Sequence, residues 1–506
     1  MGTDVRRLLV LLLFALPLFG QSRESITVEV IDVPVYVSRN GQPVTGLTRD
    51  DFEVTVNGKP QPIDYFDVDD LGLSAPAAAQ PGAPQPEAAP PPIRERRLFL
   101  LVIDRQFSNP HAVGRARAAA EKLVNSAAPA DWFSVTTFDG GGTRLLVPFT
   151  QDRVAVMRAV RSLRPSTTED PLRLSISPLE RQSWSGVDRD EAAPGADLTD
   201  VDPLSSRPES GTAVMADMGA DPMRRSIGYQ VQALRELARS TAQIEGHKHV
   251  VLLSEGFATM LAARSDKLVR AIRVMAEEFR AASAFLHTVD LGGLRGPAAP
   301  IGQMGQSNRS LTNTSANDAL NMLAQPTGGQ WLHNTNDVAT ALTQMAESQR
   351  IVYRLGFRPR NPRRGMNAIV VRVKNVRGAD VMYRHGFSTT HEDAPVNPLR
   401  LADIILNDLP QTGVAPRLEP LPDGIRIVVP AAAAAQDAKA RDAELLLYLF
   451  DANGVPADVH SLRVPFNGSD RIVDVHRSWP PGRYVAKALL RVGDAIGFAR
   501  TELVRE

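Results

Sequence analysis

Three largely apolar segments constrain the fold more than any other feature of this sequence. Leu98 to Ile103 and Val250 to Leu253 are uninterrupted, whereas Ala284 to Val289 also contains His287 and Thr288. A run of this kind needs burial on both faces, as in a parallel sheet that has helices on each side. Helical patterns lie between the runs, for example at Gln232 to Thr241. Because this alternation continues to about Thr335, we predict a doubly wound α/β domain.

The first helix of this domain has a recognisable start. Asn109 is a residue type that caps helices, and Pro110 suits the first helical position. Val113, Ala116 and Ala120 then follow at helical spacing. We expect this helix to leave the strand at Leu98 to Ile103 almost at once.

Strand patterns flank the α/β region on both sides. Apolar residues alternate at Val33, Val35 and Val37, and again from Ile351 to Phe357. Each group has too few strands to bury its own apolar face. We therefore predict that residues 25–70 and 350–390 form one β-sandwich, with the α/β domain inserted between them. The alternative is that the first strands pack on the C-terminal strands instead.

The remaining segments complete the predicted organisation. Residues 71–96 are rich in Ala and Pro and should form an extended linker. The α/β domain covers residues 97–349, and residues 165–222 form a polar surface insertion within it. Short strands and turns over residues 398–506 predict a second β-sandwich.

The composition limits the range of functions. Lys plus Arg and Asp plus Glu number 57 each, so no overall charge favours binding to nucleic acid. There are no cysteines, which excludes disulfides and thiolate ligands.

Arg6 and Arg7 precede an apolar run from Leu8 to Phe19, a pattern typical of a signal peptide over residues 1–20. We expect an exported protein, periplasmic or secreted, without a transmembrane segment after cleavage. The alternative is an uncleaved anchor.

Several short motifs occur in a fixed order along residues 25–390. They include Pro43 to Thr48, Leu101 to Asp104, Leu146 to Thr150, Leu252 to Phe257 and Thr327 to Gly329. Together they resemble the von Willebrand factor A-related proteins of acidobacteria. The resemblance implies a Rossmann-like von Willebrand factor A (vWA) domain that binds a protein partner. The predicted fold class is thus α/β plus all-β, with this domain inserted in a β-sandwich and a second sandwich after it.

The resemblance also implies a divalent-cation site at the carboxyl ends of the strands, where hard oxygen ligands suit Mg²⁺. Asp104 and Ser108 match the first motif of that site, but Gln106 replaces its first Ser. Glu255 stands where the family has a later Asp. The family's Thr cannot be placed: the expected loop falls near Met223-Arg224-Arg225, and Gly211-Thr212 could supply it if the insertion folds back. We therefore expect a degenerate metal site.

Two interpretations of the Asp104 site remain open at this stage. One is a working site that binds Mg²⁺ through Asp104, Ser108 and Glu255. The other is a strand-end Asp that is satisfied by backbone N–H groups or by an Arg. We expect that no cofactor binds, with Mg²⁺ as the alternative. Acidic residues from Asp188 to Asp202 could form a Ca²⁺ loop, but their spacing fits no EF-hand, and a solvated loop is the simpler reading.

No catalytic signature was found. The sequence lacks a phosphate-binding Gly-x-x-x-x-Gly-Lys loop, a His-Glu-x-x-His motif and a Gly-x-Ser-x-Gly elbow. His247 and His249 could form a metal pair but are simply polar at a strand entry in the plainer reading, and His287 and His333 are expected at sheet edges. Four arginines between Arg358 and Arg364 could contact an anionic surface, or could line a solvated hairpin.

These observations favour a non-enzymatic binding protein. We predict that it engages a protein partner in the cell envelope or the extracellular space, by adhesion or binding. A structural or assembly component of the envelope is one alternative, in which the sandwiches act as spacers. A hydrolase with an unrecognised site is another.

Overall fold

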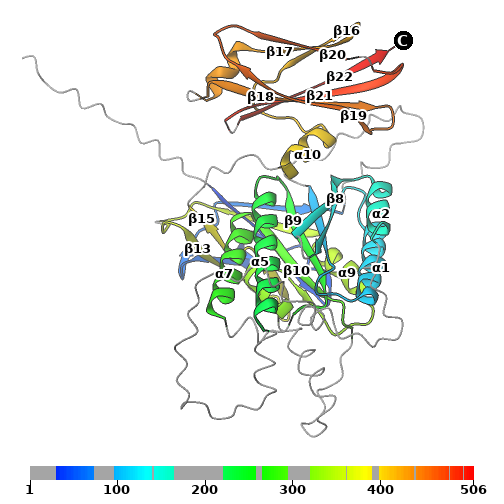
Figure 1. Cartoon of the computed structure of the whole chain (residues 1–506). Coiled ribbons are helices and arrows are strands. Elements are labelled where there is room, and N and C mark those ends of the chain that lie inside the picture. Colours follow the sequence, from blue (N-terminus) through cyan, green and yellow to red (C-terminus); the bar gives the residue numbers. More distant parts are fainter. Residues whose placement is uncertain are drawn as a thin grey trace, which may run out of the picture.

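The structure is a computed structural model that describes residues 30–72, 96–139, 142–163, 220–257, 265–293, 319–360, 362–389, 398–437, 440–477, 479–493 and 495–505. The predicted signal peptide, Gly211-Thr212 and the acidic residues from Asp188 to Asp202 lie outside these residues. The predicted mixture of α/β and all-β structure is confirmed (Figure 1).

A six-stranded sheet forms the centre of the α/β part. Its order is β11-β10-β9-β6-β7-β8. All neighbouring pairs are parallel except β7 with β8. The strands are β6 (Arg97–Asp104), β7 (Trp132–Asp139), β8 (Gly142–Thr150), β9 (His247–Ser254), β10 (Ala284–Asp290) and β11 (Trp331–Leu332). Each predicted apolar run lies within one central strand, and every residue of β6, β9 and β10 is buried.

Helices cover both faces of this sheet (Figure 1). One face packs against α1 (Pro110–Ser126), α2 (Arg153–Arg161) and α9 (Val338–Ser348). The other packs against α5 (Ala220–Ala242) and α7 (Asp266–Ala281), while η3 (Gln325–Thr327) precedes β11. The predicted start of α1 is confirmed, because the Asn109 side chain accepts a hydrogen bond from the N–H of Ala112.

Two further sheets combine strands from either side of the α/β part. The first has the order β14-β1-β12-β5, with β2 also paired to β1, and the second has the order β15-β13-β3-β4. Their strands are β1 (Ile31–Arg39), β2 (Gln42–Pro43), β3 (Phe52–Val56), β4 (Lys59–Gln61), β5 (Tyr65–Asp70), β12 (Ile351–Phe357), β13 (Met366–Val373), β14 (Asp380–Tyr383) and β15 (Gly386–Ser388), with η1 (Arg49–Asp51) before β3. Val33, Tyr353 and Phe387 belong to one buried cluster between the two sheets.

The outer face of the first of these sheets packs on the α/β part. Tyr36 of β1 lies 5.8 Å from Phe285 of β10, ring centre to ring centre, and both are buried. Val352 and Met382 complete the same cluster. β1 is therefore buried on both faces. For this reason nearly all of its residues are buried, and buried and exposed residues do not alternate along the strand.

The C-terminal part consists of two facing sheets, with the orders β16-β17-β20 and β19-β18-β21-β22. The strands are β16 (Arg417–Leu421), β17 (Gly424–Val429), β18 (Asp442–Asp451), β19 (Pro456–Pro465), β20 (Arg471–His476), β21 (Gly482–Val492) and β22 (Ala495–Arg505), with η4 (Ala431–Gln436) between β17 and β18. Leu445, Leu447 and Leu449 alternate inward from β18, as their spacing predicted.

One helix was not predicted. α10 (Pro398–Asn407) lies between the C-terminal sheets and the α/β part (Figure 1). Leu399 packs into the α/β core, whereas Ile404 and Ile405 pack on the sheet that contains β18. The helix has only ten residues, fewer than the window over which helical periodicity is distinguished from other patterns, so the sequence did not reveal it.

The ends of the predicted linker also need correction. Leu71 and Arg96 were assigned to an extended segment, but both are buried. The Arg96 guanidinium forms a bidentate ion pair with Asp403 of α10. The packed structure therefore extends into both ends of the Ala/Pro-rich stretch.

Candidate functional site at the strand ends

The candidate site lies where the order of the parallel strands reverses. From β6 the chain continues to β7 on one side, and it reaches β9 on the other side only later. Successive connections diverge at such a point and leave a crevice outside the carboxyl ends of the two strands. Asp104 is the last residue of β6, and Ser254 is the last residue of β9. The site therefore brings together two segments 150 positions apart.

Asp104 is fully buried and is surrounded by hydrogen-bond donors. Its Oδ1 accepts from the backbone N–H groups of Gln106 and Phe107, each at 2.9 Å. Its Oδ2 accepts from Nε2 of Gln230 at 2.8 Å and from the Ser254 hydroxyl at 2.5 Å. Both carboxylate oxygens thus have protein donors, two from the turn after β6, one from α5 and one from β9.

Burial and hydrogen bonding act in opposite directions on this carboxyl group. Burial raises the pKa of Asp104 to about 6, while the hydrogen bonds from Phe107, Ser254, Gln106 and Gln230 oppose that rise. None of its hydrogen-bonding partners is a cation. The carboxyl group is therefore held by dipoles, which compensate a buried charge less fully than an opposite charge does.

A second carboxylate lies beside the first but binds elsewhere. The Oε2 of Glu255 accepts the backbone N–H of Asn109 at 2.8 Å, and its Oε1 accepts the Asn109 side-chain amide at 3.0 Å. The backbone N–H of Glu255 donates to the Ser108 hydroxyl at 3.3 Å. Gly256 follows with a φ of 77°, in the left-handed region, which turns the chain immediately after Glu255. Glu255 therefore fastens the start of α1 to the end of β9.

The structure brings the three site residues that the sequence predicted together at the carboxyl ends of β6 and β9. Asp104, Ser108 and Glu255 are linked through Ser254 and Asn109. The expectation for the third ligand was wrong, because Met223, Arg224 and Arg225 lie within α5 and do not form a loop.

The residue of α5 that contacts Asp104 is Gln230, which lies more than one helical turn beyond those arginines. Sequence reasoning missed it, since a single Gln within a helix matches no motif. Of the two donors expected for a strand-end Asp, the backbone N–H groups are confirmed, and an amide and a hydroxyl take the place of the Arg.

This arrangement does not fit a divalent cation. Mg²⁺ needs oxygen lone pairs directed at one point, but a donor already faces each oxygen of both carboxylates. Gln230 directs N–H, not an oxygen, at Oδ2 of Asp104. Among the described residues, no group of three or more His, Asp or Glu side chains converges as metal ligands would.

The histidines also differ from expectation. His287 was expected at a sheet edge, but it is completely buried within β10, next to the equally buried His249. His247 and His249 are the first and third residues of β9. Burial lowers the pKa of His247 and of His287 to about 3 and lowers that of His249 as well. These histidines are neutral core residues, whereas the exposed ring of His333 stacks on Trp331.

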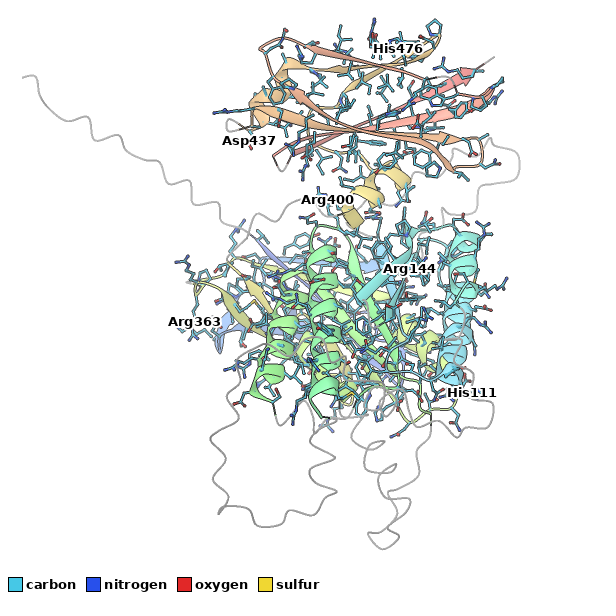
Figure 2. The ribbon with its side chains drawn as sticks, viewed as in Figure 1. His111, Arg144, Arg363, Arg400, Asp437 and His476 are labelled. Carbon is cyan, nitrogen blue, oxygen red and sulfur yellow. The ribbon has the colours of Figure 1, made fainter. Side chains whose placement is uncertain are left out.

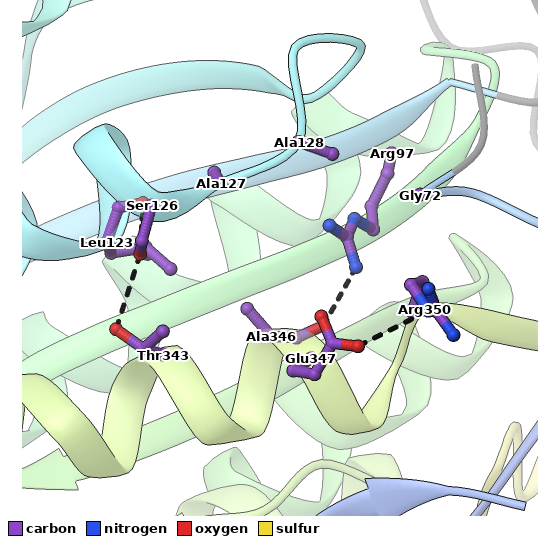
Figure 3. Close-up of a pocket in the computed structure, with 10 residues that line it drawn as sticks. All are labelled: Gly72, Arg97, Leu123, Ser126, Ala127, Ala128, Thr343, Ala346, Glu347 and Arg350. Atoms are coloured by element: carbon purple, nitrogen blue, oxygen red, sulfur yellow. Dashed lines mark hydrogen bonds and ion pairs between the residues drawn. The ribbon is translucent and has the colours of Figure 1, made fainter. Parts of the chain in front are cut away.

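A small cavity lies at the opposite end of the strands, near the start of β6 and between the ends of α1 and α9 (Figure 3). Its volume is about 200 Å³, and Arg97, Ser126 and Glu347 are among its lining residues. The polar groups there are already paired: Arg97 binds Asp131 and the carbonyl of Ala346, and Glu347 binds Arg350. The cavity therefore offers little to a ligand.

Comparisons with known proteins identify no family. No protein-family model matches the chain, and no curated protein matches it. Among solved structures, the conserved hypothetical protein BatB from Bacteroides thetaiotaomicron is 14% identical over 50% of this chain and 98% of its own, with a TM-score of 0.24. The SpRpn10 VWA domain is 7% identical over 49% of this chain and 93% of its own, with a TM-score of 0.20. The fold of this chain rests on its own strand pairings.

None of the helices within the described ranges combines the length and the apolar character that crossing a bilayer requires.

Proposed function

We propose that this chain is an exported, non-enzymatic binding protein, periplasmic or secreted. Its vWA-like domain is inserted in one β-sandwich and followed by another, and it engages a protein partner at the Asp104 crevice without a bound cation. The hydrogen bonding of Asp104 carries the proposal. In a cation-dependent site the carboxylates are left for the metal, whereas here Gln230 and Ser254 occupy Oδ2. Because Asp104, Gln230 and Ser254 are all buried, their hydrogen bonds hold the turn after β6 and the end of β9 in place beneath the exposed residues around them.

The surroundings of the crevice support a role in binding. Arg105 and Asp139 form a partly exposed ion pair beside it, and His111 in the first turn of α1 is exposed. Phe107 and Phe257 pack together beneath the surface with ring centres 5.8 Å apart. A polar rim over a rigid apolar floor is a common arrangement at protein interfaces. The Ser254 hydroxyl and the Asp104 carboxylate are hydrogen-bonded, but both are fully buried, which argues against their acting on a substrate.

A site-specific photo-crosslinker tests this function. His111 lies at the crevice edge, whereas His476 is an equally exposed histidine at the far end of the molecule (Figure 2). A photoreactive residue is introduced at one or the other position in cells that make the protein naturally. We expect a discrete protein adduct from position 111, unchanged when a chelator is added, and none from position 476. Adducts of equal yield from both positions, or loss of the adduct with chelator, would contradict the proposal.

The spacer function remains a second candidate because of one observation. α10 joins the α/β part to the C-terminal sheets through the buried Arg96–Asp403 pair, and Lys487 of β21 donates to the carbonyl of Ile405 at 2.9 Å. A rigid connection of this kind would suit a component that holds others at a fixed distance. An adduct from position 476 alone would favour this candidate.

A further inference from the structure

The loop between β12 and β13 carries an unusual concentration of positive charge. Arg358, Arg360, Arg363 and Arg364 are all exposed; we call them the arginine loop. Their guanidinium groups form no ion pair with any residue in the described ranges. Arg354, only four positions before the loop, is by contrast paired and binds Asp32 at 2.8 Å. The arginine loop is thus a local cluster of uncompensated charge in a chain of zero net charge.

The backbone of the arginine loop is nevertheless held firmly. Asn367 is completely buried, and its side chain accepts the N–H of Arg363 and donates to the carbonyl of Arg363, both at 2.8 Å. The Thr389 hydroxyl donates to the same carbonyl at 2.9 Å. The Asp64 carboxylate accepts the backbone N–H of Arg358 at 2.8 Å. A fixed backbone reduces the conformational entropy that is lost when a ligand binds, so the four side chains are presented from a prepared platform.

From these features we propose that the arginine loop binds the phosphate groups of an anionic membrane surface. A guanidinium group presents a planar fork of N–H donors that matches phosphate oxygens. Basic clusters next to anionic lipid act through such contacts and need no inserted apolar side chain. Figure 2 places Arg363 at the outer edge of the molecule, away from the six-stranded sheet.

The sequence of the loop favours a membrane over single-stranded nucleic acid as the source of the phosphates. Two prolines and an asparagine separate the arginines, and no aromatic residue lies among them. Single-stranded nucleic acid, by contrast, is held largely by stacking on aromatic rings.

This inference concerns a surface other than the Asp104 crevice, and its test is independent of the protein partner. The chain without residues 1–20 is incubated with phosphatidylcholine vesicles that contain or lack phosphatidylglycerol, and bound protein is measured by flotation. The variant is Arg363→Gln with Arg364→Gln. The charge-matched control is Arg270→Gln with Arg273→Gln, since these arginines of α7 are exposed and have no ion-pair partner in the described ranges.

We expect binding that requires phosphatidylglycerol. The control should bind like the unaltered chain, and the loop variant should bind about 25-fold more weakly, at about fivefold for each arginine. Arg358→Gln with Arg360→Gln should weaken binding similarly and provides a second variant if the first fails to fold. Equal losses in the control and loop variants would overturn the inference. So would loop-dependent binding of inorganic phosphate or duplex DNA without vesicle binding.

Discussion

The Nδ1 of His249 lies 3.2 Å from the Nε2 of His287 in the buried layer between the α/β part and the strands that flank it. The backbone N–H of Gln330 donates to Nδ1 of His287, so a neutral His287 carries its proton on Nε2 and donates to His249. His249 then carries its own proton on Nε2, which faces the Tyr36 hydroxyl at 3.5 Å. The direction of each hydrogen bond is fixed by the one before it.

Acid should therefore destabilise the fold through this layer. The pKa of His247 and of His287 is about 3 in the folded state but 6.5 when unperturbed. Between these values the unfolded chain binds more protons, so the free energy of unfolding falls as pH falls below 6.5. The slope should approach about 1.4 kcal/mol per pH unit for each histidine. Urea denaturation at pH 7 and pH 5 measures it, and His287→Gln should reduce the slope. A free energy of unfolding that does not change over this range would contradict the assignment.

Asp104 should show the opposite pH dependence. Its folded pKa of about 6 lies above the ordinary 3.8, so between these values the folded state binds more protons, and its stabilising contribution is lost as pH rises through 6. The Asp104→Asn variant has no titrating carboxyl group at this position, so it loses no stability in this way. The free energy of unfolding of this variant, relative to the unaltered chain, should increase by about 1 kcal/mol between pH 5 and pH 6. Denaturation curves of both proteins at each pH give this difference, and a constant difference would place the Asp104 pKa outside this range.

Introducing the cation ligands that the sequence resemblance implies should fail unless Gln230 is also removed. Gln106→Ser and Glu255→Asp supply the missing oxygen ligands, but the Gln230 amide still occupies Oδ2 of Asp104. We expect no Mn²⁺ binding by calorimetry for the unaltered chain or for this double variant, and measurable binding when Gln230→Ala is added. Asp104→Ala in the triple variant is the control and should abolish the binding. Micromolar affinity in the unaltered chain would show that the site accepts a cation after all.

The sequence revealed elements whose signals are local. The run Leu98 to Ile103 predicted β6 because a strand buried on both faces must be apolar throughout, and Asn109 with Pro110 predicted the start of α1 because capping depends on adjacent residues. The position of Asp104 at a strand end followed from the same signals.

The sequence could not reveal features that depend on contacts between distant segments. Gln230 is 126 positions from Asp104, and its role follows from how α5 crosses the sheet. His287 appeared polar, yet its burial depends on β1 covering β10. α10 was missed for a different reason: its ten residues are too few to show a helical period clearly.

The strands that flank the α/β part should not fold without each other. β1 has β12 and β14 as its neighbours, and β3 pairs with β13. A fragment of residues 22–73 should therefore remain unfolded by circular dichroism until residues 351–390 are added. A fragment of residues 96–349 should fold alone, and it must include α9, which packs on α1. A stably folded fragment of residues 22–73 would be incompatible with these pairings.

The Arg96–Asp403 pair should determine how firmly α10 holds the C-terminal sheets. Both side chains are nearly inaccessible to solvent, with 2% and 4% exposed, and the pair is bidentate at 3.1 and 2.9 Å. Asp403→Asn leaves a buried guanidinium without its counter-charge, which typically costs about 3–5 kcal/mol. We expect a loss of this size in urea denaturation. Small-angle X-ray scattering should also report a larger radius of gyration, because the C-terminal sheets are released.

Arg426 and Asp474 provide the matched control for this prediction. They form an equally bidentate pair, at 2.8 and 2.9 Å, but on the exposed surface of the C-terminal sheets. Water and salt screen such a pair, so Asp474→Asn should leave both the denaturation curve and the scattering profile essentially unchanged. The two substitutions remove the same charge from the same kind of geometry. A difference between them therefore isolates the effect of burial at α10, and equal behaviour of the two variants would mean that Asp403 does not anchor the helix.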